Sequence, residues 1–353
     1  MTNKVLFLLK RREDYSIEKH SSIGLSTGLY NSAKFMDIML NESEIESHLE
    51  VCIDNNNIDA YVTKYRPTHV IIEALWCVPQ KFQILTKLHP NVTWIIRIHS
   101  EMPFMAGEGN AMDWIGDYAS YPNINIACNS PRMLGEIKSF LSVKYNWSNE
   151  YTNERVMFLP NYYPQEFIKK QFNKNKETID ISCFGAVRPL KNHLLQAHAA
   201  IKFANKMGKK LRFHINSGRI EMKGDSALSN LKGLFQHMDE SGHELISHEW
   251  TPREQFLELC GKMDIAMQVS FTETWNIVSG DSISQGVPIV VSSEIPWASY
   301  LFLANPVNSD DMVNALHASY NCPQLNVWLN KRKMTKYTNN TRKIWEKYFG
   351  TAS

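Results

Sequence analysis

Short apolar runs alternate with longer amphipathic stretches along most of the chain. In the first half, stretches with the apolar spacing of helices start at residues 30, 57, 79 and 113. Uninterrupted apolar strands are typical of parallel sheets that are covered on both faces, and their alternation with helices indicates βαβ units. The runs that we interpret as strands in this half are 4–9, 49–53, 68–74, 92–101, 125–130 and 156–163.

The same alternation restarts after a polar, lysine-rich segment at residues 165–178. Thr251, with Glu254 three positions later, predicts a capping box at the start of one helix. A chain of 353 residues is long for a single core, so we interpret the polar segment as a domain boundary. The predicted strands beyond it are 179–185, 210–216, 245–250, 264–269 and 289–292, and the predicted helices are 194–207, 230–241, 252–262, 309–319 and 326–349.

Composition describes a soluble globular protein, with 43% hydrophobic and 21% charged residues. The net charge of +2 neither demands nor excludes a nucleic-acid partner. The six cysteines are too far apart in sequence to form metal-binding pairs, and they predict buried, reduced thiols in a cytoplasmic protein. The apolar run at residues 5–9 is too short for a signal peptide or a membrane span. No Asp-x-Asp motif occurs, so we expect neither a metal nor another cofactor.

The stretch 264–292 carries the most chemical information. It predicts a buried strand, a loop that carries Glu273, a short helix, a Gly-Val-Pro turn and a second buried strand. The start of such a helix presents unpaired backbone amides and a partial positive charge, which together form a phosphate site. Asp281 lies on the helix, eight positions after Glu273. An ordinary strand–loop–helix–strand unit with solvated acids is the alternative interpretation.

The spacing of Glu273 and Asp281 resembles the acid-x7-acid signature of the retaining GT-B glycosyltransferases, the superfamily of glycogen and sucrose synthases. There the second acid is normally Glu, and Asp281 is one methylene shorter. The resemblance implies that Asp281 holds the ribose of a nucleotide and that Glu273 holds hydroxyls of the transferred sugar. It also implies that the diphosphate meets the backbone of Thr274, Trp275, Asn276, Ile277 and Val278.

Residues 185–192 resemble another segment of that family, Gly-x-x-Arg-x-x-Lys-Asn. Negative charge develops on the leaving diphosphate when the glycosidic bond breaks, and two cations held against it in a site with little water stabilise that charge. Because no metal motif is present, we predict that Arg188 and Lys191 are these catalytic cations.

Further donor-side candidates lie near the ends of other predicted strands. Asn216 and Gly218 are expected near the nucleotide, and Trp250 either stacks on its base or packs in the core. In the first half, Gly24 and Gly28 belong to a loop that would face the donor phosphates or the acceptor, or that is purely structural.

Candidates on the acceptor side follow the fourth predicted strand of the first half. His99 resembles the family's histidine that contacts the transferred sugar; the alternative is a structural histidine with its hydrogen bonds satisfied. Glu101 and Glu108 lie in a glycine-bearing loop and could shape an acceptor pocket, or act as a base if the enzyme inverted.

Together these features predict an α/β protein of two Rossmann-like domains, the GT-B architecture, with the active site in the cleft between them. The domains are expected at 1–165 and 176–329, and the resemblance implies that a terminal helix, 330–353, packs back on the first. The predicted enzyme moves a sugar from a nucleotide-diphosphate sugar, expected to be a UDP-sugar, to a hydroxyl group without a metal and with retention.

The acceptor is open at the level of sequence. A hydroxymethylated base in bacteriophage DNA, flipped into the site in the host cytoplasm, would suit the compact length and the basic segments. A cell-surface glycan or a lipid-linked saccharide is the alternative acceptor. A non-catalytic nucleotide-sugar-binding protein and a sugar epimerase are alternatives of different classes. The basic terminal helix is either a solvated face or a surface for an anion.

Overall fold

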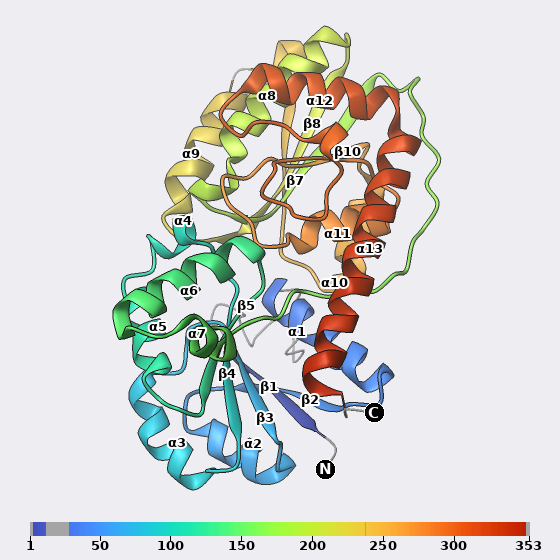
Figure 1. Ribbon diagram of the computed structural model, residues 1–353. Coiled ribbons are helices and arrows are strands. Elements are labelled where there is room, and N and C mark those ends of the chain that lie inside the picture. The colour runs from blue at the N-terminus through green and yellow to red at the C-terminus, as the bar shows by residue number, and fades with distance from the viewer. Residues whose placement is uncertain (1–2, 12–27, 237, 351–353) are drawn as a thin grey trace. The chain divides into compact units, whose positions relative to one another are not determined.

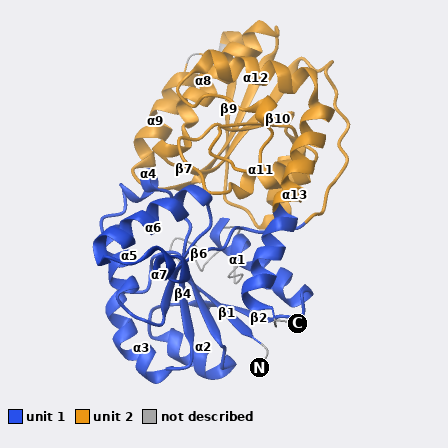
Figure 2. Ribbon diagram, viewed as in Figure 1, with its two compact units in different colours: residues 1–164, 338–353 blue, residues 165–337 orange. Residues whose placement is uncertain are grey.

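The computed structural model describes residues 3–11, 28–236 and 238–350, and the chain divides into two compact α/β units (Figure 1). Unit 1 consists of residues 1–164 and 338–353, and unit 2 of residues 165–337 (Figure 2). Each unit is built on one sheet in which every described strand pair is parallel. The predicted fold class is therefore confirmed. None of the described helices is long and apolar enough to cross a membrane.

Unit 1 has a six-stranded sheet of order β2-β1-β3-β4-β5-β6. The strand order reverses between β1 and β3, which is the topological switch point of a doubly wound sheet. The predicted glycine loop around Gly24 lies outside the described residues. The elements are β1 (Lys4–Lys10), α1 (Gly28–Glu42), β2 (Glu46–Cys52), α2 (Asn57–Tyr65), β3 (His69–Glu73), α3 (Phe82–Leu88), β4 (Thr93–Ile98), α4 (Met102–Met105), α5 (Ala111–Ala119), β5 (Ile124–Cys128), α6 (Pro131–Tyr145), α7 (Asn149–Arg155) and β6 (Val156–Phe158).

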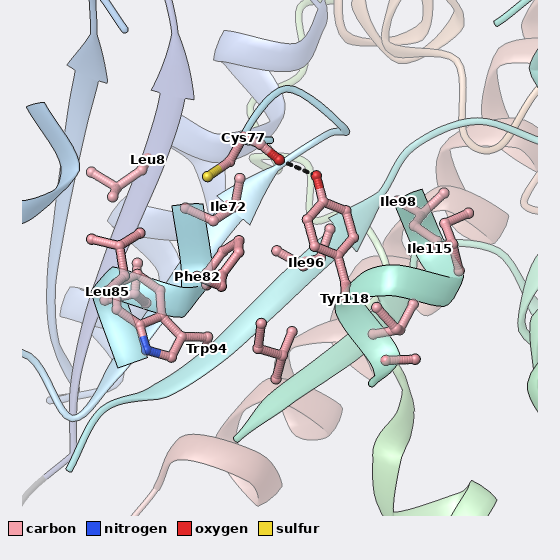
Figure 3. Packing of buried hydrophobic residues seen from close by; sticks show 14 of the residues in the cluster. Leu8, Ile72, Cys77, Phe82, Leu85, Trp94, Ile96, Ile98, Ile115 and Tyr118 are labelled. Atoms are coloured by element: carbon pink, nitrogen blue, oxygen red, sulfur yellow. Dashed lines mark hydrogen bonds between the residues drawn. The ribbon is translucent and has the colours of Figure 1, made fainter. Parts of the chain in front are cut away.

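One hydrophobic cluster of unit 1 contains Phe82 of α3 (Figure 3). Its ring meets Trp94 of β4 and Tyr118 of α5 edge-on, with ring centroids 5.3 and 5.7 Å apart. Such aromatic pairs stabilise a core beyond the area that they bury. The Tyr118 hydroxyl donates to the carbonyl of Cys77, and burial raises the pKa of the Cys77 thiol to about 12. All six cysteines are free thiols; five are buried as predicted, and Cys322 is exposed.

Unit 2 has a five-stranded sheet of order β11-β10-β7-β8-β9. The order reverses between β7 and β10, so these two strands flank the switch point of this unit. Helix α8 packs against α9 and α12. The elements are β7 (Thr178–Val187), α8 (His193–Lys206), β8 (Lys210–Ile220), α9 (Gly224–Phe235), β9 (Glu244–His248), α10 (Arg253–Lys262), β10 (Ile265–Gln268), α11 (Ile277–Ser284), β11 (Ile289–Val291) and α12 (Ser309–Asn321).

The last helix, α13 (Pro323–Phe349), begins in unit 2 and ends in unit 1. In unit 2, the Asn326 side chain accepts from the amide of Ile289 and donates to its carbonyl, at 3.1 and 2.8 Å, which satisfies backbone groups at the sheet edge. In unit 1, the Trp345 indole donates to the carbonyl of Pro160 at 2.9 Å and its ring lies 5.8 Å from that of Phe7.

Several predicted element boundaries are wrong. The helix predicted at 230–241 is α9, which starts at Gly224 and ends at Phe235. The strand predicted to end at Asn216 continues through polar residues to Ile220. A short helix, α4, replaces part of the predicted loop after Glu101, and α7 was not predicted. Residues 217–229 and α7 are largely polar, so apolar periodicity is weak there, and α4 is a four-residue segment, too short to show a helical period.

The predicted capping box at Thr251 is also wrong. Pro252 is the N-cap residue of α10, and no side chain caps that helix end. Among the described residues, the buried hydroxyl of Thr251 has no hydrogen-bond partner. By contrast, Asn-Ser-Pro at residues 129–131 predicts a helix start with Pro131 in its first turn, and the start of α6 confirms it: the Ser130 hydroxyl accepts from the amide of Met133 at 3.1 Å.

Candidate functional site

The candidate site in unit 2 lies where the chain leaves two neighbouring strands. After β7 the chain passes through a 3-10 turn, Pro189–Lys191, into α8. After β10 it runs through the loop that carries Glu273 into α11. Ligands of doubly wound sheets bind beyond the carboxyl ends of the strands at the switch point, and β7 and β10 flank that point here. The topology alone therefore brings the two predicted motifs to one place.

Lys191 and Glu273 form an ion pair, with 2.5 Å between Nζ and Oε1. Their side chains are only 9% and 7% exposed, so the pair is shielded but still reached by solvent. Burial acts to raise the pKa of Glu273, but Lys191 and then Arg188 outweigh it, so the pKa lies below its ordinary value. Glu273 is therefore ionised at neutral pH and lies within the electrostatic reach of both predicted cations.

Gln268, at the end of β10, connects this pair to α11. Its Oε1 accepts from Lys191 Nζ at 3.3 Å and from Asn276 Nδ2 at 2.9 Å. Its Nε2 donates to the carbonyl of Phe184 on β7 at 2.8 Å. The buried amide of Gln268 thus fixes both predicted motifs to the central strands. Sequence patterns did not single it out, because an amide inside an apolar run carries no spacing signal.

The first turn of α11 lies beside the same residues. Asn276 has a positive φ of 64°, and its Oδ1 accepts from the amide of Ser279 at 2.8 Å. This cap satisfies one of the orphan amides of the helix and leaves those of Ile277 and Val278 without an intrahelical acceptor. A Cβ built at Gly185, where φ is 110°, would lie 3.8 Å from Lys191 Cε and 3.9 Å from Val278 Cγ2. Lys191 and the helix start therefore converge beside Gly185.

Arg188 shares a carboxylate with a second arginine. Its Nη1 donates to Glu221 Oε2 at 3.3 Å, and Arg219 donates to Glu221 Oε1. The Arg219 guanidinium lies 5.1 Å from the ring centre of Trp250, in cation–π geometry. Arg219 lies on β8, and Glu221 directly follows this strand. Neither was predicted, since the strand was expected to end at Asn216.

Asp281 lies on α11 and is only 1% exposed. Its Oδ1 accepts from Arg253 Nη2 of α10 at 2.7 Å. The carboxylate is therefore part of an ion pair that sequence patterns did not reveal, because its partner lies on another helix. Its role toward a ribose remains a prediction.

Three other donor-side candidates have structural contacts. Asn216 Oδ1 accepts from the amide of Gly185 at 3.0 Å, so it shapes the end of β7. A Cβ at Gly218 would lie 3.0 Å from the amide of Trp250, which explains why a glycine is needed there. Trp275 is fully buried, and its carbonyl accepts from the Trp297 indole at 2.9 Å. Thr274 lies between Glu273 and this core tryptophan, half-buried.

In unit 1, His99 follows β4 and has protein partners on both ring nitrogens. Its Nε2 bonds to Glu73, and Asn129 Nδ2 bonds to its Nδ1 at 3.2 Å. Burial, together with Arg97, lowers the pKa of His99 against the opposing effect of Glu73, so the ring is neutral at neutral pH. These contacts match the structural alternative weighed for this histidine, and a contact with a sugar would have to displace or share one of them.

The weaker unit 1 candidates lie in different surroundings. Glu101 is 2% exposed, and it accepts from the Ser130 hydroxyl and, at 3.0 Å, from Arg132 Nε, so it secures the start of α6. Glu108 is exposed between α4 and α5. Gly28 is the first residue of α1, and the loop before it lies outside the described residues.

The structure thus gathers Arg188, Lys191, Glu273 and the start of α11 within unit 2, while His99 and Glu101 form separate groups within unit 1. Within the described ranges, no three His, Cys, Asp or Glu side chains gather as the ligands of a metal ion would. The cations of unit 2 are the groups suited to a phosphate-bearing ligand.

No protein-family model matches the chain, and no curated protein matches it. Solved structures do match along the whole chain. A sucrose-phosphate synthase from Thermosynechococcus elongatus has a TM-score of 0.68 at 10% identity, covering 99% of this chain and 100% of that one. A UDP-forming trehalose-phosphate synthase from Burkholderia xenovorans has a TM-score of 0.64 at 11% identity, covering 99% and 98%. The Anabaena protein HepE, solved in complex with UDP, has a TM-score of 0.60 at 10% identity, covering 98% of both chains. Identity this low shows the fold: the chain has the two Rossmann-like units of the GT-B architecture.

Proposed function

We propose that this chain is a glycosyltransferase that moves a sugar from a nucleotide-diphosphate sugar to a hydroxyl group. The observation that carries the proposal is the Lys191–Glu273 pair, with Arg188 and the start of α11 beside it, at the switch point of unit 2. Proteins of the same fold include a UDP-forming synthase and a protein solved with UDP, which supports UDP as the nucleotide.

In this proposal the diphosphate is bound by Arg188, Lys191 and the amides of Ile277 and Val278. Cations and helix amides that are already oriented need no reorganisation as the leaving group gains charge. Loss of one such group typically costs on the order of 3 kcal/mol of barrier. The charge on the leaving group is met by side chains and amides, so the reaction needs no metal in this proposal.

Glu273 is assigned to the hydroxyls of the transferred sugar. An ionised carboxylate accepts hydrogen bonds strongly, but its lowered pKa makes it a poor proton acceptor at neutral pH. This favours a retaining reaction in which the departing phosphate takes the proton of the acceptor hydroxyl. Asp281, held by Arg253, is assigned to the ribose.

For the acceptor we propose the hydroxyl of a hydroxymethylated base in DNA. The base would be flipped out of the duplex to reach the donor. A glycan or lipid-linked saccharide acceptor would give activity on free oligosaccharides that does not depend on salt, whereas DNA binding falls steeply with salt.

The test is a panel of UDP-, GDP- and ADP-sugars incubated with the protein and followed for slow release of the nucleotide diphosphate. Release by one nucleotide class supports the proposal. Binding without release, seen as a thermal shift, would instead indicate a non-catalytic binder, and an isomerised donor would indicate an epimerase. A ligand at a hundred times its Kd stabilises by roughly 2.7 kcal/mol, so binding is readily detected.

Matched variants connect the activity to the site. Lys191→Ala should lower the rate of release by roughly a hundredfold or more. Lys202→Ala, which removes a lysine of α8 that pairs with Asp310 at the surface, should leave release unchanged. Equal release by both variants would contradict the assignment.

A further inference from the structure

Gln268 is a buried polar residue at the end of an apolar strand. It is 1% exposed and closes β10, whose other residues are Ile265, Ala266 and Met267. An amide in such surroundings is costly unless its donors and acceptors are paired. The side chain of Gln268 makes three hydrogen bonds, and its partners indicate what it does.

Backbone groups on two sides fix which way the Gln268 amide points. The amide of Ser279 can only donate, so Asn276 turns its Oδ1 toward it, at 2.8 Å, and presents its Nδ2 to Gln268 at 2.9 Å. The carbonyl of Phe184 can only accept, so Gln268 turns its Nε2 toward it, at 2.8 Å. Both contacts require that Oε1 of Gln268, and not Nε2, faces Lys191.

Lys191 is therefore held by one charged and one neutral acceptor. An ammonium has three N–H donors. Glu273 Oε1 lies 2.5 Å from Nζ and Gln268 Oε1 lies 3.3 Å from it, so two of these donors are used. Among the described residues, no acceptor meets the third donor. A Cβ at Gly185 would lie 3.8 Å from Lys191 Cε, so the absence of a side chain there leaves room beside the lysine.

The neutrality of Gln268 also decides the charge of this group. Lys191 and Glu273 carry opposite charges that sum to zero, and Gln268 adds a second acceptor for the ammonium without adding a charge. A carboxylate at position 268 would offer the same acceptor, but it would leave a net negative charge that repels a diphosphate. A buried amide thus suits an anion site where a second carboxylate does not.

We propose that Gln268 is a positioning residue of the donor site, which orients the Lys191 ammonium and reserves one of its N–H groups for the diphosphate. This inference deepens the proposed function and rests on it for the identity of the ligand. In this role Gln268 acts through Lys191 and does not contact the ligand itself.

The test titrates UDP, GDP and ADP into wild-type protein by calorimetry and then follows the tightest of them in two variants. Gln268→Met nearly preserves the shape of the side chain but removes the acceptor of Lys191, so the affinity should fall roughly fivefold, as for one lost hydrogen bond. Gln268→Glu keeps an acceptor but adds a negative charge, so the affinity should fall by about a further tenfold.

Two further variants distinguish positioning from general support of the fold. Gln268→Met should weaken binding in the wild-type background but not in Lys191→Ala, because the ammonium that Gln268 positions is absent there. The control is Asn326→Leu, which removes another buried amide of unit 2, bonded to backbone groups of Ile289 at the amino end of β11. It should lower the stability toward urea, as Gln268→Met does, and leave the affinity unchanged.

Three outcomes would overturn the proposal and leave the donor site standing. They are wild-type affinity in Gln268→Met, tighter binding by Gln268→Glu than by Gln268→Met, and an equal loss on Gln268→Met in the Lys191→Ala background, which would show that Gln268 acts on the fold alone. Wild-type protein that binds none of the three nucleotides would instead overturn the proposed function, and the role of Gln268 with it.

Discussion

Each unit contains an ion pair near the carboxyl ends of central strands, and the two pairs differ in their exposure to solvent. We call the fully buried pair of unit 1 the closed pair and the partly exposed pair of unit 2 the open pair. In unit 1, Arg97 and Glu73 are both 0% exposed. Arg97 donates to both carboxylate oxygens of Glu73 at 3.0 and 3.2 Å, to the carbonyl of Leu159 at 3.0 Å and to Asn161. In unit 2, Lys191 donates to Glu273 at 2.5 Å and to Gln268 at 3.3 Å, and the pair remains 9% and 7% exposed.

The difference distinguishes an ion pair that only supports the fold from one whose cation can exchange its acceptor for a ligand. The planar guanidinium of Arg97 is held by a fixed set of acceptors, so a ligand cannot enter without breaking several bonds. An ammonium is a compact charge on a flexible stem and can turn to a new acceptor. A diphosphate could therefore take a share of Lys191 at little cost, and this is the property that a donor site needs.

The largest expected effect comes from breaking the closed pair. Arg97→Met leaves the buried Glu73 without its arginine and with only the neutral His99 beside it, which should cost about 3–5 kcal/mol of unfolding free energy. Urea denaturation measures this loss. Lys64→Met removes an exposed partner of Glu50 and should cost no more than about 1 kcal/mol. Similar losses in the two variants would remove the distinction between closed and open pairs.

Breaking the open pair should act on the reaction. Lys191→Ala and Arg188→Ala should each lower the turnover of the nucleotide-sugar by roughly a hundredfold or more, because each removes a charge from the proposed leaving-group site. Steady-state kinetics at saturating donor measure the change, with Lys202→Ala as the control. Turnover near the wild-type rate in both site variants would contradict the proposal that Lys191 and Arg188 stabilise the leaving group.

A third buried carboxylate, Asp180, tests whether a buried ion pair in unit 2 must affect the site. It lies near the amino end of β7, away from the site. Asp180 accepts from Arg212 at 2.7 Å and from His214 at 3.0 Å. Burial acts to raise the pKa of Asp180, but His214 and Arg212 lower it from 3.8 to about 2. Because the folded pKa lies below the unfolded one, the stabilisation is present above about pH 4 and is lost as the pH falls through about 2.

Asp180→Asn should therefore cost about 2 kcal/mol of unfolding free energy at pH 7. The cost should shrink steadily in denaturation experiments between pH 4 and pH 2, and the affinity for UDP should not change. A cost independent of pH would contradict the ion-pair origin of this stabilisation.

The smallest predicted effect concerns Glu221, the carboxylate that Arg188 and Arg219 share. Glu221→Gln removes a negative charge beside the proposed diphosphate site. Because the repulsion between this carboxylate and a diphosphate is about 1 kcal/mol, its loss should tighten UDP binding roughly fivefold. Calorimetry with UDP and with uridine distinguishes charge from shape. Equal changes for the two ligands would show that Glu221 acts only on the local structure.

The fold was predictable because buried parallel strands are continuous apolar runs. Residues 5–9 in β1 and 70–72 in β3 are examples. The start of α6 was predictable because its cap and its proline are neighbours in sequence. The bounds of α9 and β8 were not, because in residues 217–229 tertiary contacts, and not apolar spacing, decide the backbone. Gly224, for example, lies against the carbonyl of Val187, where a Cβ would be 2.1 Å away.

The site was predictable to the extent that its groups follow strand ends at family-like spacings, as Lys191 and Glu273 do. Their partners were not predictable in this way. Gln268, Glu221 and Arg253 act through contacts with residues that are distant in sequence. A carboxylate or amide at such a position looks like any polar residue until the fold is known, and the satisfied state of His99 is visible only with Glu73 and Asn129 in place.

The central claim is that the open pair of unit 2 is a nucleotide-diphosphate site. Calorimetric titration of UDP, GDP and ADP into wild-type protein and into Lys191→Ala tests it most directly. We predict that one of the three binds the wild-type protein and that the variant weakens this binding roughly tenfold or more, as expected for a lost charged hydrogen bond. Equal affinities in the two proteins, or no binding of any of the three, would contradict the claim.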